Sequence, residues 1–214
     1  TAAAKRSAAM TDQLLAYSRK QIHNPQVIDV NRSIESQKWM LQRMVGETVD
    51  LVFHPGEPVW PVRIDPSQLD QILANLVVNA RDAIDGSGTV TITTENVCFE
   101  VSDDCPPDLP PGEYVRITFS DTGTGMDESV LHRLFEPYFT TKAAGEGTGL
   151  GLSTVYGIVR QNDGDITVDS QPGEGARFHI HLPKNDAQPE RPEDPTKKMV
   201  PGWGETVRVV EDEQ

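Results

Sequence analysis

Two asparagines spaced four residues apart are the first pair whose type and spacing can do chemistry. Asn75 and Asn79 lie in a segment of helical pattern, and Asp82 follows three residues later, so all three side chains project from one helical face. An amide oxygen is a suitable hard ligand for Mg²⁺, an ion that usually keeps several waters and shares substrate phosphates. A solvated helix face shows the same pattern, so this pair alone leaves both interpretations open.

Residues 121–125, Asp-Thr-Gly-Thr-Gly, follow a predicted strand and form a second candidate. The carboxylate of Asp121 can accept a hydrogen bond from the exocyclic amine of adenine. Gly123 and Gly125 let the backbone approach a flat ring closely. A turn rich in Asp and Gly is the alternative interpretation.

Residues 145–153, Gly-Glu-Gly-Thr-Gly-Leu-Gly-Leu-Ser, open a predicted helix. Glycines at a helix N-terminus expose N–H donors in a partly positive field, which suits a polyphosphate. The spacing matches neither the dinucleotide-binding nor the P-loop pattern, and a flexible hinge is the alternative. Lys142 can reach a terminal phosphate as a point charge, although an exposed loop lysine gives the same pattern. We interpret Phe135 and Phe139 as hydrophobic anchors of the intervening stretch.

The elements that must position these residues mix helices with alternating strands. Asp65 and Pro66 predict the start of the helix that carries the asparagines, and Gly86 predicts its stop. Asn31 is the predicted N-cap of an earlier helix that ends at Val45. The other predicted helices span residues 2–23, 127–134 and 149–161, and the predicted strands span residues 27–30, 51–53, 60–64, 89–97, 114–120, 165–170 and 176–182. This order predicts an α+β fold, a two-layer α/β sandwich.

The charge and composition of the chain limit its partners. Its 214 residues include 19 Lys and Arg against 33 Asp and Glu, a net charge of −14, so attraction to nucleic acid or to an anionic membrane surface is not expected. Local N–H donors and a cation can still hold a nucleotide. Cys98 and Cys105 form neither a disulfide framework nor a zinc pattern, and His179 and His181 lack an evident third ligand. A reduced, cytoplasmic setting fits best.

Taken together and in this order, the segments resemble the ATP-binding (catalytic) domain of sensor histidine kinases. That domain has a Bergerat-type fold, shared with DNA gyrase, mismatch-repair ATPases and a heat-shock chaperone. The corresponding boxes are residues 75–80 (N box), 121–125 (first glycine box), 135–139 (F box) and 147–151 (second glycine box). Residues 79–83, Asn-Ala-Arg-Asp-Ala, make the chain most similar to hybrid histidine kinases of the CckA type.

The resemblance implies ATP and Mg²⁺ as cofactors and assigns roles to individual residues. Asn79 would chelate Mg²⁺, Asn75 and Lys142 would act on the phosphates as catalytic residues, and Asp121 would hold adenine. Residues 126–146 would form an ATP lid. The full set implied to contact nucleotide is Asn75, Asn79, Asp82, Asp121, Gly123, Gly125, Met126, Phe139, Thr140, Thr141, Lys142, Gly147, Thr148, Gly149, Leu150, Gly151 and Leu152.

The same resemblance predicts how the chain is divided. Residues 1–24 would be a remnant of the second helix of a dimerisation hairpin, 25–184 the catalytic domain, 185–204 a linker and 205–214 the start of a truncated receiver domain. The family's His-Glu phosphoacceptor motif is not found at any of the five histidines. We therefore expect the γ-phosphoryl group to pass to a histidine outside this chain, and we expect the chain not to phosphorylate itself. The implied partners are that histidine and a receiver domain or response regulator, within a homodimeric bacterial sensor kinase of which this is a cytoplasmic portion.

One departure from the family pattern and two alternatives remain at this point. Gly175-Ala176 stands where the family often has Gly-Thr, which puts a water-mediated adenine contact in doubt. An ATPase clamp on the same fold would carry a Glu four residues before the metal-binding Asn, but Asn75 occupies that place and is no general base. A non-catalytic nucleotide-binding scaffold is the second alternative.

Overall fold

A five-stranded mixed sheet forms one layer of the structure, a computed structural model that describes residues 24–100, 106, 109–143 and 147–189. The strands, in sheet order, are β2 (Val49–His54), β4 (Gly88–Phe99), β5 (Gly112–Asp121), β7 (Ala176–Pro183) and β6 (Asp165–Ser170). β2 and β4 are parallel, and the other neighbours are antiparallel. A separate two-stranded sheet joins β1 (Gln26–Ile28) to β3 (Val62–Ile64).

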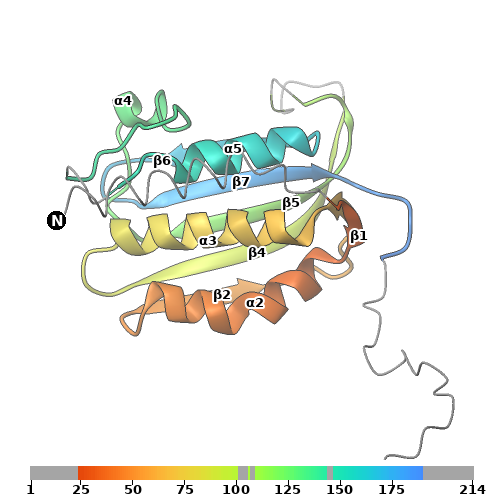
Figure 1. Cartoon of the computed structure of the whole chain (residues 1–214), viewed down its shortest axis with the longest axis horizontal. Coiled ribbons are helices and arrows are strands. Elements are labelled where there is room, and N and C mark those ends of the chain that lie inside the picture. Colours follow the sequence, from red (N-terminus) through yellow and green to blue (C-terminus); the bar gives the residue numbers. More distant parts are fainter. Residues whose placement is uncertain (1–23, 101–105, 107–108, 144–146, 190–214) are drawn as a thin grey trace, which may run out of the picture.

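Three helices cover one face of the larger sheet (Figure 1). They are α2 (Val30–Val45), α3 (Pro66–Ala83) and α5 (Gly151–Gln161). α3 is the central helix and packs against both α2 and α5. A short helix, α4 (Glu128–Leu131), lies outside this row (Figure 1). The arrangement confirms the predicted α+β sandwich of two layers.

The sequence of α3 explains both its start and its orientation. The Asp65 side chain accepts a hydrogen bond from the Ser67 N–H at 2.9 Å, and Pro66 occupies the first turn, where its missing N–H costs nothing. The apolar positions of the helix are buried and face the sheet, and each buried Leu, Ile or Val contributes roughly 1.5–3 kcal/mol to folding. These positions are Leu69, Ile72, Leu73, Leu76, Val77 and Ala80. Burial of this stripe fixes the rotation of α3 and hence the direction of its polar side chains.

The strand register brings the carboxylate of Asp121 to the end of the sheet. In β5, Val115, Ile117 and Phe119 alternate into the core beneath the helices. Asp121 is the next residue on that face, and it pairs with Val90 of β4 and Ala176 of β7. The strand alternation therefore turns this carboxylate to the side of the sheet that the helices cover.

Several predicted element boundaries are wrong, and side-chain contacts explain one of the clearest cases. The N-cap of α2 is Asp29, which accepts from the Arg32 N–H at 3.1 Å, rather than Asn31. The Asn31 side chain instead donates to the Gly56 carbonyl and accepts from the Thr94 hydroxyl. The strand predicted at 27–30 ends at Ile28 instead, because Val30 is already the first residue of α2 and is fully buried.

Two helices near the glycine boxes also differ from expectation. The helix predicted over 127–134 is only the single turn of α4, with Asp127 capping the Val130 N–H at 3.0 Å. α5 begins at Gly151, two residues later than the prediction, and α3 ends at Ala83 before reaching Gly86. Strands β2 and β4 extend beyond their predicted ranges, whereas β3 is shorter.

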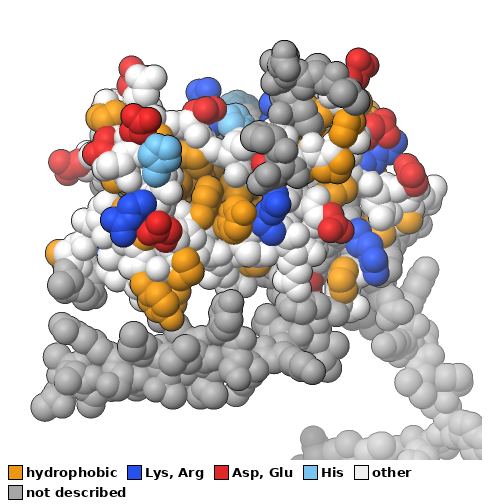
Figure 2. All heavy atoms as spheres, turned by 90° about the horizontal axis from the view of Figure 1, so that it is seen from above, with side chains coloured by type: hydrophobic (Ala, Val, Ile, Leu, Met, Phe, Trp, Pro, Cys, Tyr) orange, Lys and Arg blue, Asp and Glu red, His pale blue; other side chains and the backbone are white. Residues whose placement is uncertain are grey.

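Some predictions fall outside the described residues, namely the helix over 2–23, most of the linker and the strand near 205–214. Among the residues that are described, no helix is long and apolar enough to cross a membrane. Figure 2 looks onto the side of the molecule uppermost in Figure 1, where hydrophobic side chains form several small groups separated by charged and polar ones.

Candidate functional site

The asparagines of α3 face the first residue of α5. A Cβ atom added to Gly151 would stand 3.5 Å from Asn75 Oδ1 and 3.7 Å from Asn79 Nδ2. The missing side chain of Gly151 therefore leaves space against both amides. The backbone of α5 starts at this space, so its unpaired N–H groups lie close to the two asparagines.

Asn79 is half-buried, and one atom of its amide has no partner among the described residues. Its Nδ2 atom is inaccessible to solvent and makes no hydrogen bond with any described residue. Leaving a buried polar atom unsatisfied costs about 1–3 kcal/mol, and such atoms are uncommon in folded proteins. A half-turn of the amide would place Oδ1 at the same point, so this side chain fits a cation as well as a phosphate oxygen.

Asp121 is held by backbone N–H groups from two sides. Its Oδ1 atom accepts hydrogen bonds from Gly123 at 2.8 Å and from Ala176 at 3.3 Å. Burial raises the pKa of this carboxyl group, and the two N–H donors act against that rise. Both bonds that the structure shows at this carboxylate involve Oδ1, so Oδ2 is the oxygen that can accept a hydrogen bond from a ligand.

The first glycine box packs onto the end of α3. The Thr124 N–H donates to the Ala83 carbonyl at 2.9 Å, and a Cβ on Gly123 would lie 2.8 Å from the same carbonyl oxygen. Ala83 follows Asn79 by about one helical turn. The loop that carries Asp121 and the helix that carries the asparagines therefore meet at Ala83.

A cavity of about 160 Å³ opens beside Asp121, on the side of the turn that joins β6 and β7. Its polar lining includes Ser120, Asp121, Asp169, Glu174 and Arg177. Asn75 and Asn79 do not line it. The contact at Ala83, rather than this cavity, connects Asp121 with the asparagines.

The F box and the second glycine box are joined to each other. The Tyr138 N–H donates to the Gly149 carbonyl at 2.8 Å, and a Cβ on Gly149 would lie only 2.3 Å from the Tyr138 carbonyl carbon. Phe135 packs its ring against Tyr156 of α5 with the centroids 5.2 Å apart. This contact supports the interpretation of Phe135 as a hydrophobic anchor. Phe139 contacts the Arg133 guanidinium, which lies 4.4 Å from its ring centroid.

The remaining predicted site residues lie in or next to the two glycine boxes and the F box. Met126 packs against the core and donates its N–H to Ser170 Oγ at 2.9 Å. A Cβ on Gly147 would touch Thr140 Oγ1 at 2.6 Å, and Leu150 N–H lies 3.4 Å from Thr148 Oγ1. Gly125 and Leu152 are half-buried, while Thr140, Thr141 and Thr148 are exposed. Residues 144–146, including part of the predicted lid, are outside the described residues.

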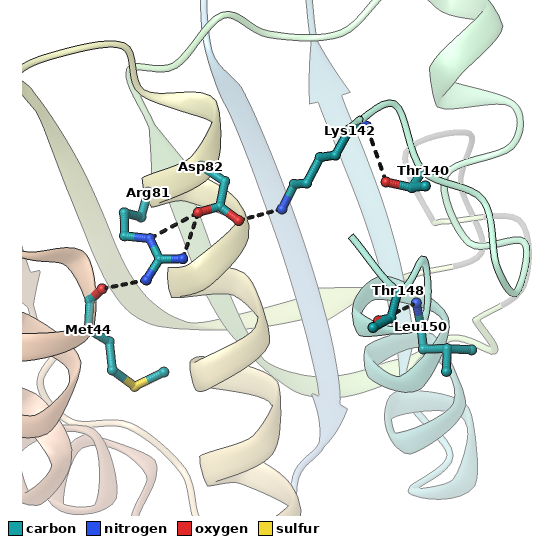
Figure 3. A network of polar contacts seen from close by, with 7 residues as sticks. All are labelled: Met44, Arg81, Asp82, Thr140, Lys142, Thr148 and Leu150. Atoms are coloured by element: carbon teal, nitrogen blue, oxygen red, sulfur yellow. Dashed lines mark hydrogen bonds and ion pairs between the residues drawn. The ribbon is translucent and has the colours of Figure 1, made fainter. Parts of the chain in front are cut away.

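Lys142 forms an ion pair with Asp82 of α3, 2.5 Å from Nζ to Oδ2 (Figure 3). Arg81 contacts the other oxygen of the same carboxylate, with Nε at 2.9 Å and Nη2 at 2.7 Å from Oδ1. Burial alone would raise the pKa of Asp82, but the hydrogen bonds from Lys142 and Arg81 outweigh it and hold the pKa below its usual value. Sequence reasoning missed Arg81, although a basic residue beside Asp82 in the last helical turn was a visible signal.

Comparisons with known proteins identify the family of the chain. Residues 64–186 match the family model of the histidine kinase-, DNA gyrase B- and HSP90-like ATPases. The chain is 41% identical over 219 aligned positions to the sensor kinase CckA of Brucella abortus (strain 2308), covering 98% of this chain and 23% of that protein. It is 36% identical to the sensor histidine kinase ZraS of Escherichia coli (strain K12), covering 75% of this chain and 31% of that protein. The chain thus spans about a quarter to a third of these curated relatives.

Solved structures show the same fold. Full-length ShkA, crystallised in complex with AMPPNP, superposes with a TM-score of 0.61 at 23% identity, covering 77% of this chain and 32% of that one. The mycobacterial sensor histidine kinase MprB superposes with a TM-score of 0.58 at 22% identity, covering 76% and 98%. The chain therefore belongs to the family of histidine kinase-, DNA gyrase B- and HSP90-like ATPases and is homologous to the catalytic portion of two-component sensor kinases such as CckA.

Proposed function

We propose that the chain binds ATP together with Mg²⁺ and donates the γ-phosphoryl group to a histidine that lies outside it. Membership of the ATPase family supports ATP binding. The observation that carries the metal and phosphate site is the buried, unpartnered Nδ2 atom of the half-buried Asn79, which faces Gly151 at the start of α5. A polar ligand at that point would satisfy the amide and the first N–H groups of α5 together.

The proposal gives each part of the site a task. When bound, Mg²⁺ neutralises charge on the polyphosphate. Asn79 is the metal ligand, Asn75 and the N–H groups at Gly149 and Gly151 bind phosphate oxygens, and Asp121 accepts from the adenine amine. Lys142 acts on the phosphates. The other predicted contacts form the surrounding wall, namely Gly123, Gly125, Met126, Phe139, Thr140, Thr141, Gly147, Thr148, Leu150 and Leu152. Transfer then depends on positioning and electrostatics rather than on a protein nucleophile in this chain.

The domain assignment and the partners belong to the same proposal. Residues 1–24 would complete a dimerisation hairpin that carries the acceptor histidine, and residues 205–214 would begin a receiver domain. The full-length protein would then be a homodimeric, bacterial hybrid kinase, with this portion in the cytoplasm. The similarity of the whole chain to a sensor kinase supports this, since 98% of it aligns with CckA.

Nucleotide titration by calorimetry tests the binding proposal. We expect the chain to bind ATP more tightly with Mg²⁺ than without it, and Asn79→Ala to lose most of that difference because it removes the metal ligand. Asn24→Ala, an exposed asparagine outside the site, is the matched control and should bind like the parent. Equal Mg²⁺-dependent affinity in the parent and Asn79→Ala would contradict the assigned ligand.

Phosphoryl transfer needs a second experiment. Radiolabelled ATP should leave the chain unlabelled, and it should label a separately supplied dimerisation hairpin on its histidine. Phosphohistidine on the chain itself would contradict the proposal. Rapid multiple-turnover phosphate release would instead favour an ATPase clamp, and binding without labelling of any hairpin would favour a scaffold.

A further inference from the structure

A chain of polar contacts connects the end of α2 with Lys142 through two adjacent residues of α3. The Arg81 Nη1 atom donates to the Met44 carbonyl oxygen at 3.3 Å, its Nε and Nη2 atoms bind Asp82 Oδ1, and Asp82 Oδ2 binds the Lys142 ammonium group (Figure 3). Four residues from three segments of the chain are thus linked in one line. None of these contacts is required to build α3 itself, because each involves side-chain atoms.

Arg81 is fixed at both ends of its guanidinium group. Met44 lies in the last turn of α2, where carbonyl groups have no partner inside the helix and carry partial negative charge. The guanidinium satisfies one of these carbonyls and still presents two N–H groups to Asp82, using the planar fork of arginine. A lysine does not reproduce this geometry, because its three donors share one nitrogen, whereas the guanidinium places separate nitrogens against the Met44 carbonyl and the Asp82 carboxylate.

The hydrogen bonds from Arg81 to one oxygen determine which oxygen of the Asp82 carboxylate is left for Lys142. Oδ1 is occupied by Arg81, so Oδ2 faces Lys142. The two cations and one anion leave the group with a net charge of about +1, so the cluster attracts an anion instead of repelling it. An ammonium group has three N–H donors, and the contact with Asp82 uses one of them.

The helical position of Asp82 places that ammonium group near the proposed metal ligand. Asp82 follows Asn79 by three residues, so their side chains lie on one face of α3, about 5–6 Å apart at Cβ. The Lys142 side chain is 31% exposed, and Asp82 is the one partner that the described residues show for its ammonium group. An ammonium group held at this point can contact a phosphate next to the metal without first being ordered by the ligand.

We propose that Arg81 and Asp82 are positioning residues, which hold the Lys142 ammonium group beside Asn79 so that the site selects a nucleotide with a terminal third phosphate. Asp82 then acts through Lys142 and does not contact the nucleotide. The proposal rests on the proposed function and deepens it by naming the source of the preference for ATP over ADP. It follows the same logic as the carboxylate-held lysine of protein kinases, on unrelated elements.

The test compares dissociation constants for Mg-ATP and Mg-ADP, measured by calorimetry. Asp82→Asn should weaken Mg-ATP binding by about tenfold and Mg-ADP binding by less than about threefold, because only the contact with the terminal phosphate depends on Lys142. Arg81→Gln should reduce the ATP-to-ADP preference by about threefold, and Arg81→Lys should not restore it. Asp85→Asn, which removes an exposed carboxylate just beyond the end of α3, should leave both constants unchanged.

A double-variant comparison separates positioning from general loss of charge. Lys142→Met should lower the ATP preference at least as much as Asp82→Asn, and the double variant should show no further loss, because the two residues act as one unit. Melting temperatures of the nucleotide-free proteins identify any variant that is merely unfolded, and Arg81→Gln supplies an independent route if Asp82→Asn fails to fold.

Two results would overturn the inference. One is an Asp82→Asn protein that binds Mg-ATP as tightly as the parent or more tightly, which would mean that the carboxylate restrains Lys142 away from the ligand. The other is additive loss in the double variant. Failure of the parent chain to bind Mg-ATP at all would instead refute the proposed function, so the two failures are distinguishable.

Discussion

Gly151 faces Asn79 with no side chain between them, and a methyl group added there would lie 3.7 Å from the Asn79 amide nitrogen. That distance is an ordinary van der Waals contact, so Gly151→Ala should fold. The added methyl occupies the space against the asparagines, and we expect it to weaken nucleotide binding by about tenfold or more. Gly157→Ala, in the middle of α5 with nothing within 4 Å, is the matched control. It should bind normally and gain about 0.5–1 kcal/mol of unfolding free energy.

A second prediction concerns the turn that supports Asp121. Gly175 has a φ of +74°, and a Cβ there would lie 2.0 Å from the Asp121 carbonyl oxygen. Gly175→Ala should therefore lower the free energy of unfolding by about 3 kcal/mol, combining left-handed backbone strain with overpacking. Gly173→Ala in the same turn has a φ of +85° but open space around the added atom, and should cost only about 1 kcal/mol. Urea unfolding of the two variants measures the difference, and equal losses would contradict it.

Local signals predicted α3 well. Asp65 and Pro66 carry an N-cap and a first-turn preference that depend on neighbours in sequence alone, and the structure confirms both. The N-cap of α2 could not be chosen in this way, because Asp29 and Asn31 are both good capping residues. Hydrogen bonds with Gly56 and Thr94, which are distant in sequence, occupy the Asn31 side chain, so Asp29 is the residue that caps α2.

The candidate site was predictable as residue types but not as pairings. The asparagines, Asp121 and the glycines could be selected because each pattern suggests its own chemistry. The link between Thr124 and Ala83, and the one from Met44 to Arg81, join segments whose approach depends on how the helices pack. The predicted start of α5 is two residues too early, because the Gly149 carbonyl accepts a hydrogen bond from the Tyr138 N–H instead of one from within the helix.

Replacing Asp121 by asparagine should separate base recognition from folding. An asparagine oxygen can still accept from the Gly123 and Ala176 N–H groups, so we expect a small change in the melting temperature. The other terminal atom becomes an N–H donor, which cannot accept from the amine of adenine. ATP affinity should fall by about tenfold or more, as measured by calorimetry. A melting temperature that collapses with affinity would show that the carboxylate is structural.

His181 predicts a pH dependence of stability. It is 2% exposed, both ring nitrogens lack a partner among the described residues, and its ring lies edge-on to Phe99 with the centroids 5.3 Å apart. Burial, with smaller contributions from Arg116 and His179, lowers its pKa from 6.5 to about 4. The unfolded chain therefore binds a proton at pH 5 that the folded chain does not, so stability is fully present above the unfolded pKa and is lost as the pH falls toward 4.

The size of this loss and its assignment to one residue can both be measured. Between about pH 7 and pH 5, His181 should account for roughly 2 kcal/mol of the decrease in unfolding free energy. His181→Leu removes the titrating ring but keeps an apolar group against Phe99, so its unfolding free energy should fall less steeply over the same range. His132→Gln, at a histidine whose side chain is 76% exposed, should follow the parent curve. Parallel curves for the parent and His181→Leu would contradict this assignment, because they would mean that burial does not lower the pKa of the ring in the folded state.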